Sequence, residues 1–204
     1  AVGGEVYFLG YGQEDGLWRT DGTQGGTRQL AAGVSPDSDS GFVRLGSSLL
    51  FIAGSSTDGR GLWKTDGTPA GTVPVKVPLD GSFNRPQELT VFQGNLYFFS
   101  PNSSPWGLWR SDGTRVGTYR LTGPGTGIGI AHVDIDRVGS QERTHVFFQD
   151  AFYFRTCTAF ECGDWRTDGT LEGTVEIPRL GFDAVAMGDL LFFLEVDSST
   201  RYEL

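Results

Sequence analysis

The sequence predicts an all-β protein of the β-propeller type, built from four-stranded antiparallel blades of about 45–56 residues. Three observations lead to this prediction. One motif occurs four times, and each copy follows a short, unbroken apolar run. The composition includes 31 Gly and 13% aromatic residues in 204 residues. Such a composition is typical of many short strands joined by tight turns.

The repeated motif sets the period of the chain. Its copies lie at residues 16–27, 61–72, 107–118 and 163–174, and a partial fifth unit spans residues 182–204. Successive Trp residues of the motif are 45, 46 and 56 residues apart. β-rich periods of about 40–50 residues indicate propeller blades. We therefore expect residues 1–204 to form a single propeller domain or a propeller fragment.

Each unit divides into the same four strands. In the third unit we expect them at residues 87–92, 95–100, 107–111 and 117–121. The second strand is the strongest signal, and its counterparts are residues 6–9, 49–52, 152–154 and 190–194. A further first strand is expected at residues 183–187. Unbroken apolar runs are typical of strands that are covered on both faces.

Two residue types recur in the motif, and we interpret both as structural. An Asp before a Gly can accept backbone N–H groups and close the turn between the third and fourth strands. These residues are Asp21, Asp66, Asp112 and Asp168. A large aromatic residue fills the gap between adjacent blades, which is the expected role of Trp18, Trp63, Trp109 and Trp165. The alternatives are a ring of carboxylates that holds cations or acts as acid and base, and Trp side chains that stack on sugars.

These residues carry a family resemblance. The pattern Leu-Trp-[Arg/Lys]-[Ser/Thr]-Asp-Gly-Thr-x-x-Gly-Thr resembles the bacterial ELWxxDGT, or hyalin-like, repeat of large secreted and surface proteins. The resemblance covers essentially the whole chain and implies a β-propeller and an exported protein. It supplies no defined activity or catalytic residues. This chain also departs from the pattern, because Gly16, Gly61 and Gly107 replace the leading Glu, and Gly163-Asp164 replaces Glu-Leu.

The sequence leaves the closure of the ring open. The C-terminal strands could complete the first blade, form a truncated fifth blade, or belong to an arc of a larger ring. An open arc would expose apolar faces and strand edges. We therefore include homo-oligomerisation and docking to further blades among the expected partners.

The varied loops supply the candidate binding residues. Loops between the second and third strands and between blades differ in every unit, whereas the other turns are short and repetitive. Residues 31–41 are one such varied loop. A scaffold that varies on one side indicates recognition on that side, although drift in unconstrained loops would look the same. The ligand-binding candidates are Trp106, Asn102, Tyr11, Arg60 and Phe160.

Two acidic stretches are metal candidates. His132, Asp134 and Asp136 alternate, and on a strand they would share a face. Asp37 and Asp39 lie in a stretch with the composition of a calcium loop, but without the spacing of an EF-hand. No cofactor is certain, and calcium is the one candidate. Ordinary solvated strand residues remain the simpler interpretation of the alternation at His132, Asp134 and Asp136.

The net charge and the two cysteines bear on the class of partner and on the cellular compartment. A net charge of -9 argues against nucleic acid as a partner. No apolar run is long enough to span a bilayer, and the start at Ala1 suggests a mature, cleaved or trimmed form. Cys157 and Cys162 are spaced for a disulfide across a hairpin, which would indicate an oxidising compartment. Free thiols in a cytosolic protein are the alternative.

Together these features predict a secreted or cell-surface module that binds carbohydrate or a surface protein without catalysis. A secreted hydrolase or lyase that uses loop carboxylates and His132 is the first alternative. A structural assembly module of a larger surface protein is the second. We predict no catalytic residues.

Overall fold

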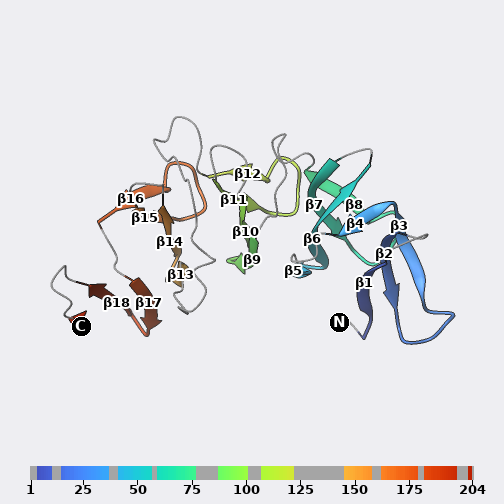
Figure 1. The fold of residues 1–204 in the computed structure, drawn as a ribbon, viewed down its shortest axis with the longest axis horizontal. Helices are drawn as coiled ribbons and strands as arrows, with labels where there is room; N and C mark the ends of the chain where they lie inside the picture. Colours follow the sequence, from blue (N-terminus) through green and yellow to red (C-terminus); the bar gives the residue numbers. More distant parts are fainter. Residues whose placement is uncertain are drawn as a thin grey trace. The chain divides into compact units, whose positions relative to one another are not determined.

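A computed structural model describes residues 4–10, 15–36, 41–56, 59–76, 87–100, 107–121, 145–157, 162–178, 182–196 and 202–203. Within these residues every regular element is a β-strand, and the strands form five sheets that follow one another along the chain (Figure 1). The all-β prediction is confirmed, whereas the closed ring stays a prediction. We call the sheets repeats 1 to 5.

The chain divides into two compact bodies. The N-terminal body comprises residues 1–103 and 109–119, and the C-terminal body comprises residues 104–108 and 120–204.

Repeat 1 is a three-stranded antiparallel sheet in chain order. It contains β1 (Val6–Gly10), β2 (Gly16–Thr20) and β3 (Arg28–Ala32). The register places Phe8 directly opposite Trp18. Because directly opposed residues of a strand pair point to the same face, these two aromatic side chains share one side of the sheet.

Repeat 2 has five strands rather than the predicted four. They are β4 (Val34–Pro36), β5 (Val43–Leu45), β6 (Ser48–Ser55), β7 (Gly59–Thr65) and β8 (Val73–Lys76). The long strand β6 pairs with β5 along its first half and with β4 along its second half. Part of the predicted loop at residues 31–41 is therefore strand, because the extra length of β6 offers backbone groups that β4 satisfies.

Repeat 3 comes closest to the predicted blade. Its strands are β9 (Gln87–Phe92), β10 (Asn95–Ser100), β11 (Gly107–Ser111) and β12 (Tyr119–Arg120), in sequential order. The first three have the predicted bounds, and β12 is shorter than expected.

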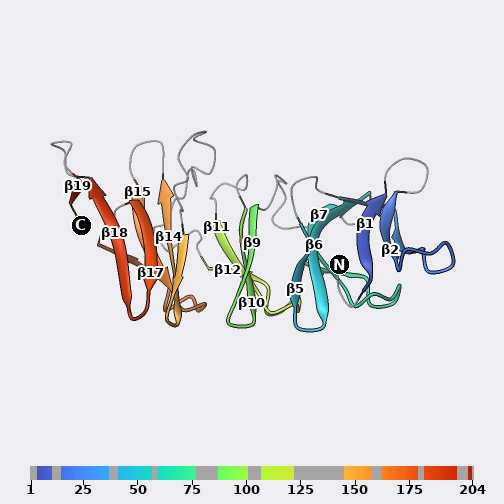
Figure 2. The ribbon, with the colours of Figure 1, turned by 90° about the horizontal axis from the view of Figure 1, so that it is seen from below.

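Repeat 4 also has four described strands. They are β13 (His145–Phe148), β14 (Ala151–Cys157), β15 (Cys162–Thr167) and β16 (Val175–Ile177). Repeat 5 contains β17 (Phe182–Met187), β18 (Leu190–Val196) and β19 (Tyr202–Glu203). Figure 2 shows β17 and β18 side by side as one hairpin.

The apolar core of the N-terminal body lies between neighbouring repeats. One cluster joins repeats 1 and 2 and contains Leu17, Leu30, Val34, Phe51, Ala53 and Trp63. A second cluster joins repeats 2 and 3 and contains Leu50, Ile52, Leu62, Val75, Leu96, Phe98 and Trp109. Adjacent residues of β6 thus belong to different clusters, which explains why its apolar run is unbroken.

Candidate functional site

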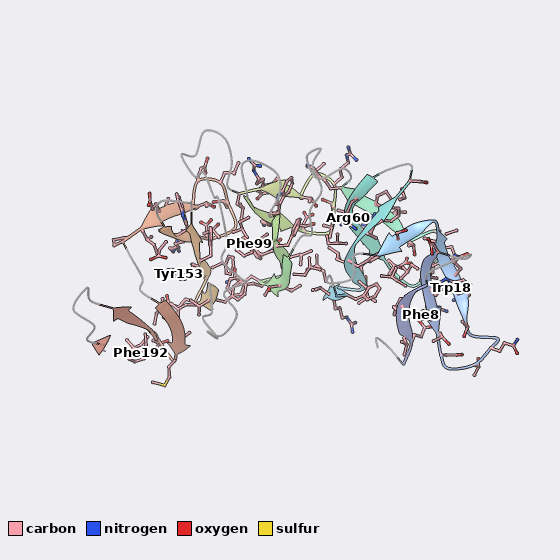
Figure 3. All side chains as sticks on the ribbon, viewed as in Figure 1. Phe8, Trp18, Arg60, Phe99, Tyr153 and Phe192 are labelled. Carbon is pink, nitrogen blue, oxygen red and sulfur yellow. The ribbon has the colours of Figure 1, made fainter. Side chains whose placement is uncertain are left out.

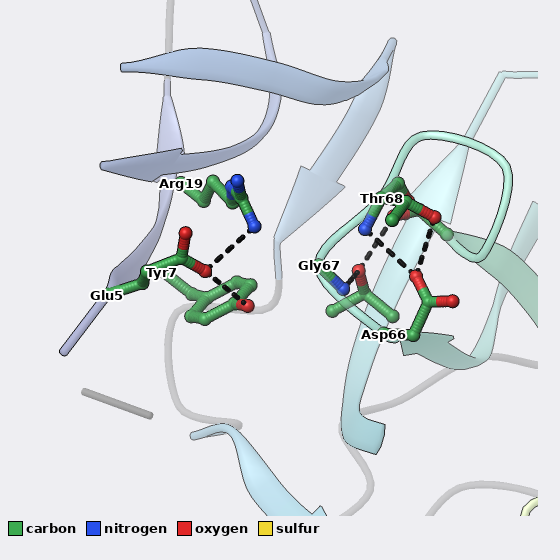
Figure 4. A network of polar contacts seen from close by, with 8 residues as sticks. Glu5, Tyr7, Arg19, Asp66, Gly67 and Thr68 are labelled. Atoms are coloured by element: carbon green, nitrogen blue, oxygen red, sulfur yellow. Dashed lines mark hydrogen bonds and ion pairs between the residues drawn. The ribbon is translucent and has the colours of Figure 1, made fainter. Parts of the chain in front are cut away.

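The turn that follows the strand with the repeated Trp carries the same polar network in repeats 1 to 4. In repeat 2, Asp66 accepts hydrogen bonds at Oδ1 from the backbone N–H and the hydroxyl of Thr68, at 2.9 and 2.7 Å (Figure 4). Gly67 has φ of 89°, a conformation that L residues rarely adopt. A short carboxylate and a glycine together form this tight turn.

Hydroxyl groups complete the same turn. Thr65 and Thr72 share a hydrogen bond of 2.7 Å between their Oγ1 atoms, and Thr65 Oγ1 also accepts the N–H of Gly67. Thr68 Oγ1 accepts the N–H of Gly71, and Thr72 donates its hydroxyl to the carbonyl of Thr68. Equivalent bonds occur in the turns of repeats 1, 3 and 4.

The second glycine of the motif has a different role from the first. A Cβ placed on Gly71 would overlap the carboxylate of Asp66, and the same holds for Gly26 with Asp21, Gly117 with Asp112 and Gly173 with Asp168. This glycine is therefore required for space rather than for a left-handed backbone. Our interpretation of the sequence missed both this glycine and the hydroxyl pair, although the fixed Gly-Thr at the end of each copy was the signal.

The turn geometry changes the acidity of the four aspartates. Hydrogen bonds from the hydroxyl of Thr68, and then from its backbone N–H, lower the pKa of Asp66 below its ordinary value. The pKa values of Asp21, Asp112 and Asp168 are lowered by the equivalent threonines. A carboxyl group with a lowered pKa stays ionised near neutral pH, which suits it poorly for general acid catalysis.

A cation from one repeat reaches the turn of the next. Arg19 and Tyr7 of repeat 1 both bond to Glu5, at 2.8 and 3.2 Å (Figure 4). Their ends lie against Gly67, where an added Cβ would come within 2.6 Å of the Tyr7 hydroxyl and 3.2 Å of Arg19 Nη1. Lys64, at the position equivalent to Arg19, donates to the carbonyl of Gly113 at 3.0 Å.

The repeated Trp side chains pack against Phe on the neighbouring strand. Trp18 stacks on Phe8 with ring centroids 6.4 Å apart, and Trp109 stacks on Phe98 at 6.1 Å. Trp63 and Trp109 are buried, and their indole N–H groups have no hydrogen-bond partner in the part of the chain that the structure describes. This favours packing as their role over sugar stacking, which needs an exposed ring.

Turns of an antiparallel sheet alternate between its two ends. In repeat 2 the β5–β6 and β7–β8 turns lie at one end, which we call the turn end, and the β6–β7 connection lies at the other, which we call the loop end. The shared hydrogen-bond network is at the turn end. The connections with varied sequences are at the loop end.

Only one candidate ligand-binding residue falls within the described residues. Arg60 is half-buried at the loop end, where β7 places it opposite Gly54; Figure 3 shows it on this strand. His132 and the other ligand and metal candidates lie outside the described residues: Trp106, Asn102, Tyr11, Phe160, Asp134, Asp136, Asp37 and Asp39. In the described part of the chain no group of three His, Cys, Asp or Glu residues could hold a metal ion.

The two cysteines end and begin neighbouring strands. Cys157 closes β14, Cys162 opens β15, and the register places them directly opposite each other. Opposed residues of an antiparallel pair have Cα atoms about 4.5–5.5 Å apart, which lies within the range that a disulfide requires. Their side chains lie outside the described residues, so the disulfide stays a prediction.

Comparisons with known proteins give a weak likeness of structure and nothing else. A scan of protein families finds no match, and neither does a comparison with curated sequences. TolB from Acinetobacter baumannii is 12% identical with a TM-score of 0.43, over 85% of this chain and 40% of TolB. The protein described as Bacteroides ovatus xyloglucan PUL GH43B is 16% identical with a TM-score of 0.35, over 88% of this chain and 40% of that one. The chain thus matches less than half of either structure, and likenesses of this size support no statement about function.

No helix among the described residues is long and apolar enough to cross a bilayer.

Proposed function

We propose that this chain is an exported, propeller-type recognition module that binds carbohydrate or a surface protein through the loop end of its repeats. The observation that carries the proposal is the difference between the turn end and the loop end of the repeats. Identical hydrogen bonds fix the turn end in four repeats, so the backbone there is held in one conformation. The loop end carries the sequences that differ from repeat to repeat, and recognition generally resides on varied loops of a rigid scaffold.

A glycan-array screen with and without calcium tests the carbohydrate ligand. The critical variant is Trp106→Ala, because Trp106 lies in the varied connection between β10 and β11 and an indole ring can stack on a sugar. The matched control is Val116→Ala, which truncates a side chain that is 92% exposed at the turn end of the same repeat.

We expect saturable binding that Trp106→Ala weakens by more than about tenfold and that Val116→Ala leaves unchanged. No binding to any glycan by folded protein would contradict a carbohydrate ligand. Equal loss in both variants would contradict the loop end as the binding surface. Calcium dependence would direct attention to the acidic stretches that contain Asp37 and Asp134.

A further inference from the structure

In repeats 1 to 3 the sheet has two distinct apolar faces, and repeat 5 has the corresponding positions on β17 and β18. One carries the repeated Trp and the Phe opposite it, such as Phe51 and Trp63, and we call it the Trp face. The other carries the apolar residues that alternate with them, such as Ile52 opposite Leu62, and we call it the Leu face. Alternation along the strands fixes which residues belong to each face.

In the N-terminal body one packing relation occurs twice. Leu9 and Leu17, on the Leu face of repeat 1, pack in the same cluster as Phe51 and Trp63 on the Trp face of repeat 2. The Leu face of repeat 2 packs likewise on the Trp face of repeat 3, in the cluster that contains Leu50 and Phe98. At both junctions, therefore, the Leu face of one repeat covers the Trp face of the next repeat.

The Trp face of repeat 1 is exposed. Val6 and Phe8 are 47% and 39% exposed, whereas Leu49 and Phe51, at the equivalent positions of repeat 2, are 5% and 0% exposed. The turn of repeat 1 follows the same trend, because Gly22 is exposed while the equivalent Gly67 is buried against repeat 1. Figure 3 shows Phe8 and Trp18 on this sheet.

The Leu face of repeat 5 is exposed as well. Met187, Leu190 and Phe192 are 66%, 62% and 43% exposed, and Figure 3 labels Phe192 on its hairpin. The hairpin registers pair Met187 with Leu190 and Leu45 with Ser48. Met187 and Phe192 therefore correspond to Leu45 and Leu50, both of which pack in the cluster between repeats 2 and 3.

We propose that these two exposed faces bind each other between copies of this chain, with the Leu face of repeat 5 in one copy covering the Trp face of repeat 1 in the next. The contact would reproduce the packing of a Leu face on a Trp face that already joins repeat 1 to repeat 2 and repeat 2 to repeat 3. It is heterologous, because each copy contributes a different surface, so association can continue from copy to copy. This association is independent of ligand binding at the loop end.

Two blocking variants and their mixture test the proposal. Val6→Asp places a charge on the Trp face of repeat 1, and Leu190→Asp places one on the Leu face of repeat 5. Each residue is more than two-fifths exposed, so each variant should fold, which circular dichroism and thermal unfolding would verify. Val116→Asp is the control, because its side chain is exposed on the turn of repeat 3.

Sedimentation velocity and equilibrium would measure the mass. We expect the wild type and Val116→Asp to form dimers and larger species as concentration rises, and each blocking variant to be monomeric. An equimolar mixture of the two blocking variants retains one intact pair of faces, so it should form dimers and nothing larger. A monomeric wild type, continued association of either blocking variant, or a mixture that stays monomeric would overturn the proposal.

Discussion

At the scale of single residues, the repeated aspartate belongs to the backbone of the turn. Asp66 uses one carboxylate oxygen for two hydrogen bonds from Thr68, and the other three copies do the same. These bonds explain why the pKa of each of these carboxyl groups is lowered. The occurrence of one such residue in four repeats thus has a local structural cause.

The lowered pKa predicts how stability depends on pH. Because the folded state favours the ionised form of Asp66, its contribution is fully present above the ordinary aspartate pKa of about 3.9. The contribution is lost as the pH falls through the lower pKa of the folded state. Asp66→Asn keeps an acceptor oxygen but removes the charge. We expect wild type to be the more stable protein at about pH 7, with a difference that shrinks at about pH 3 and below.

Urea denaturation of wild type and Asp66→Asn across this pH range would measure the free energy of unfolding of each protein. A difference that stays constant with pH would show that the ionisation of Asp66 does not contribute to folding.

At the scale of elements, each turn is specified by a short stretch of chain. The interactions that close the turn of repeat 2 join residues no more than seven positions apart, from Thr65 to Thr72. Two glycines serve it in different ways, since Gly67 adopts positive φ and Gly71 leaves room for Asp66. A turn with this many local constraints fixes where the third strand ends and the fourth begins.

Two adjacent glycines in repeat 1 allow a matched test of this explanation. Gly26→Ala would push a methyl group into the carboxylate of Asp21 and break its bonds to Thr23, whereas a Cβ on Gly25 meets no atom within 4 Å. We expect Gly26→Ala to lower the free energy of unfolding by about 1–2 kcal/mol. Gly25→Ala should change it by less than about 0.5 kcal/mol.

Chemical denaturation of the two variants and of wild type distinguishes them. Equal effects of the two substitutions would mean that the space beside Asp21 is not what requires a glycine.

At the scale of the whole molecule, stability depends on how one repeat packs on the next. Lys76 of repeat 2 illustrates this, because its Nζ donates to the carbonyl of Thr118 at 3.1 Å and lies 5.6 Å from the centroid of the Trp109 ring. Both contacts are with repeat 3. Polar and aromatic contacts thus reinforce the apolar cluster that the two repeats share.

Removing this contact should weaken the N-terminal body. We expect Lys76→Met to lower the free energy of unfolding by about 1 kcal/mol, through the loss of one hydrogen bond and one cation–π contact. The control is Arg44→Met, because Arg44 is exposed and donates to the carbonyl of Gly46 in its own turn; its effect should be near zero. Denaturant titration measures both, and a larger effect of Arg44→Met would contradict the assigned role of Lys76.

Much of the fold could be predicted from the sequence, because its signals are local. The apolar run and the turn that follows it placed β10 and β11 at their observed bounds. Strand β4 was missed, because its pairing depends on the unexpected length of β6. Of the candidate binding residues, the structure describes only Arg60, so the proposed site rests on the sequences that vary from repeat to repeat at the loop end.

The amino-acid sequence by itself determined the class of fold, the period and the closure of each turn, since these depend on residues that are neighbours along the chain. Only the tertiary structure decided which faces of the sheets are covered. Phe8 and Phe51 occupy the same position of the repeat, yet one is 39% exposed and the other is buried. The difference arises because burial depends on a neighbouring repeat, whose residues lie tens of positions away in the sequence.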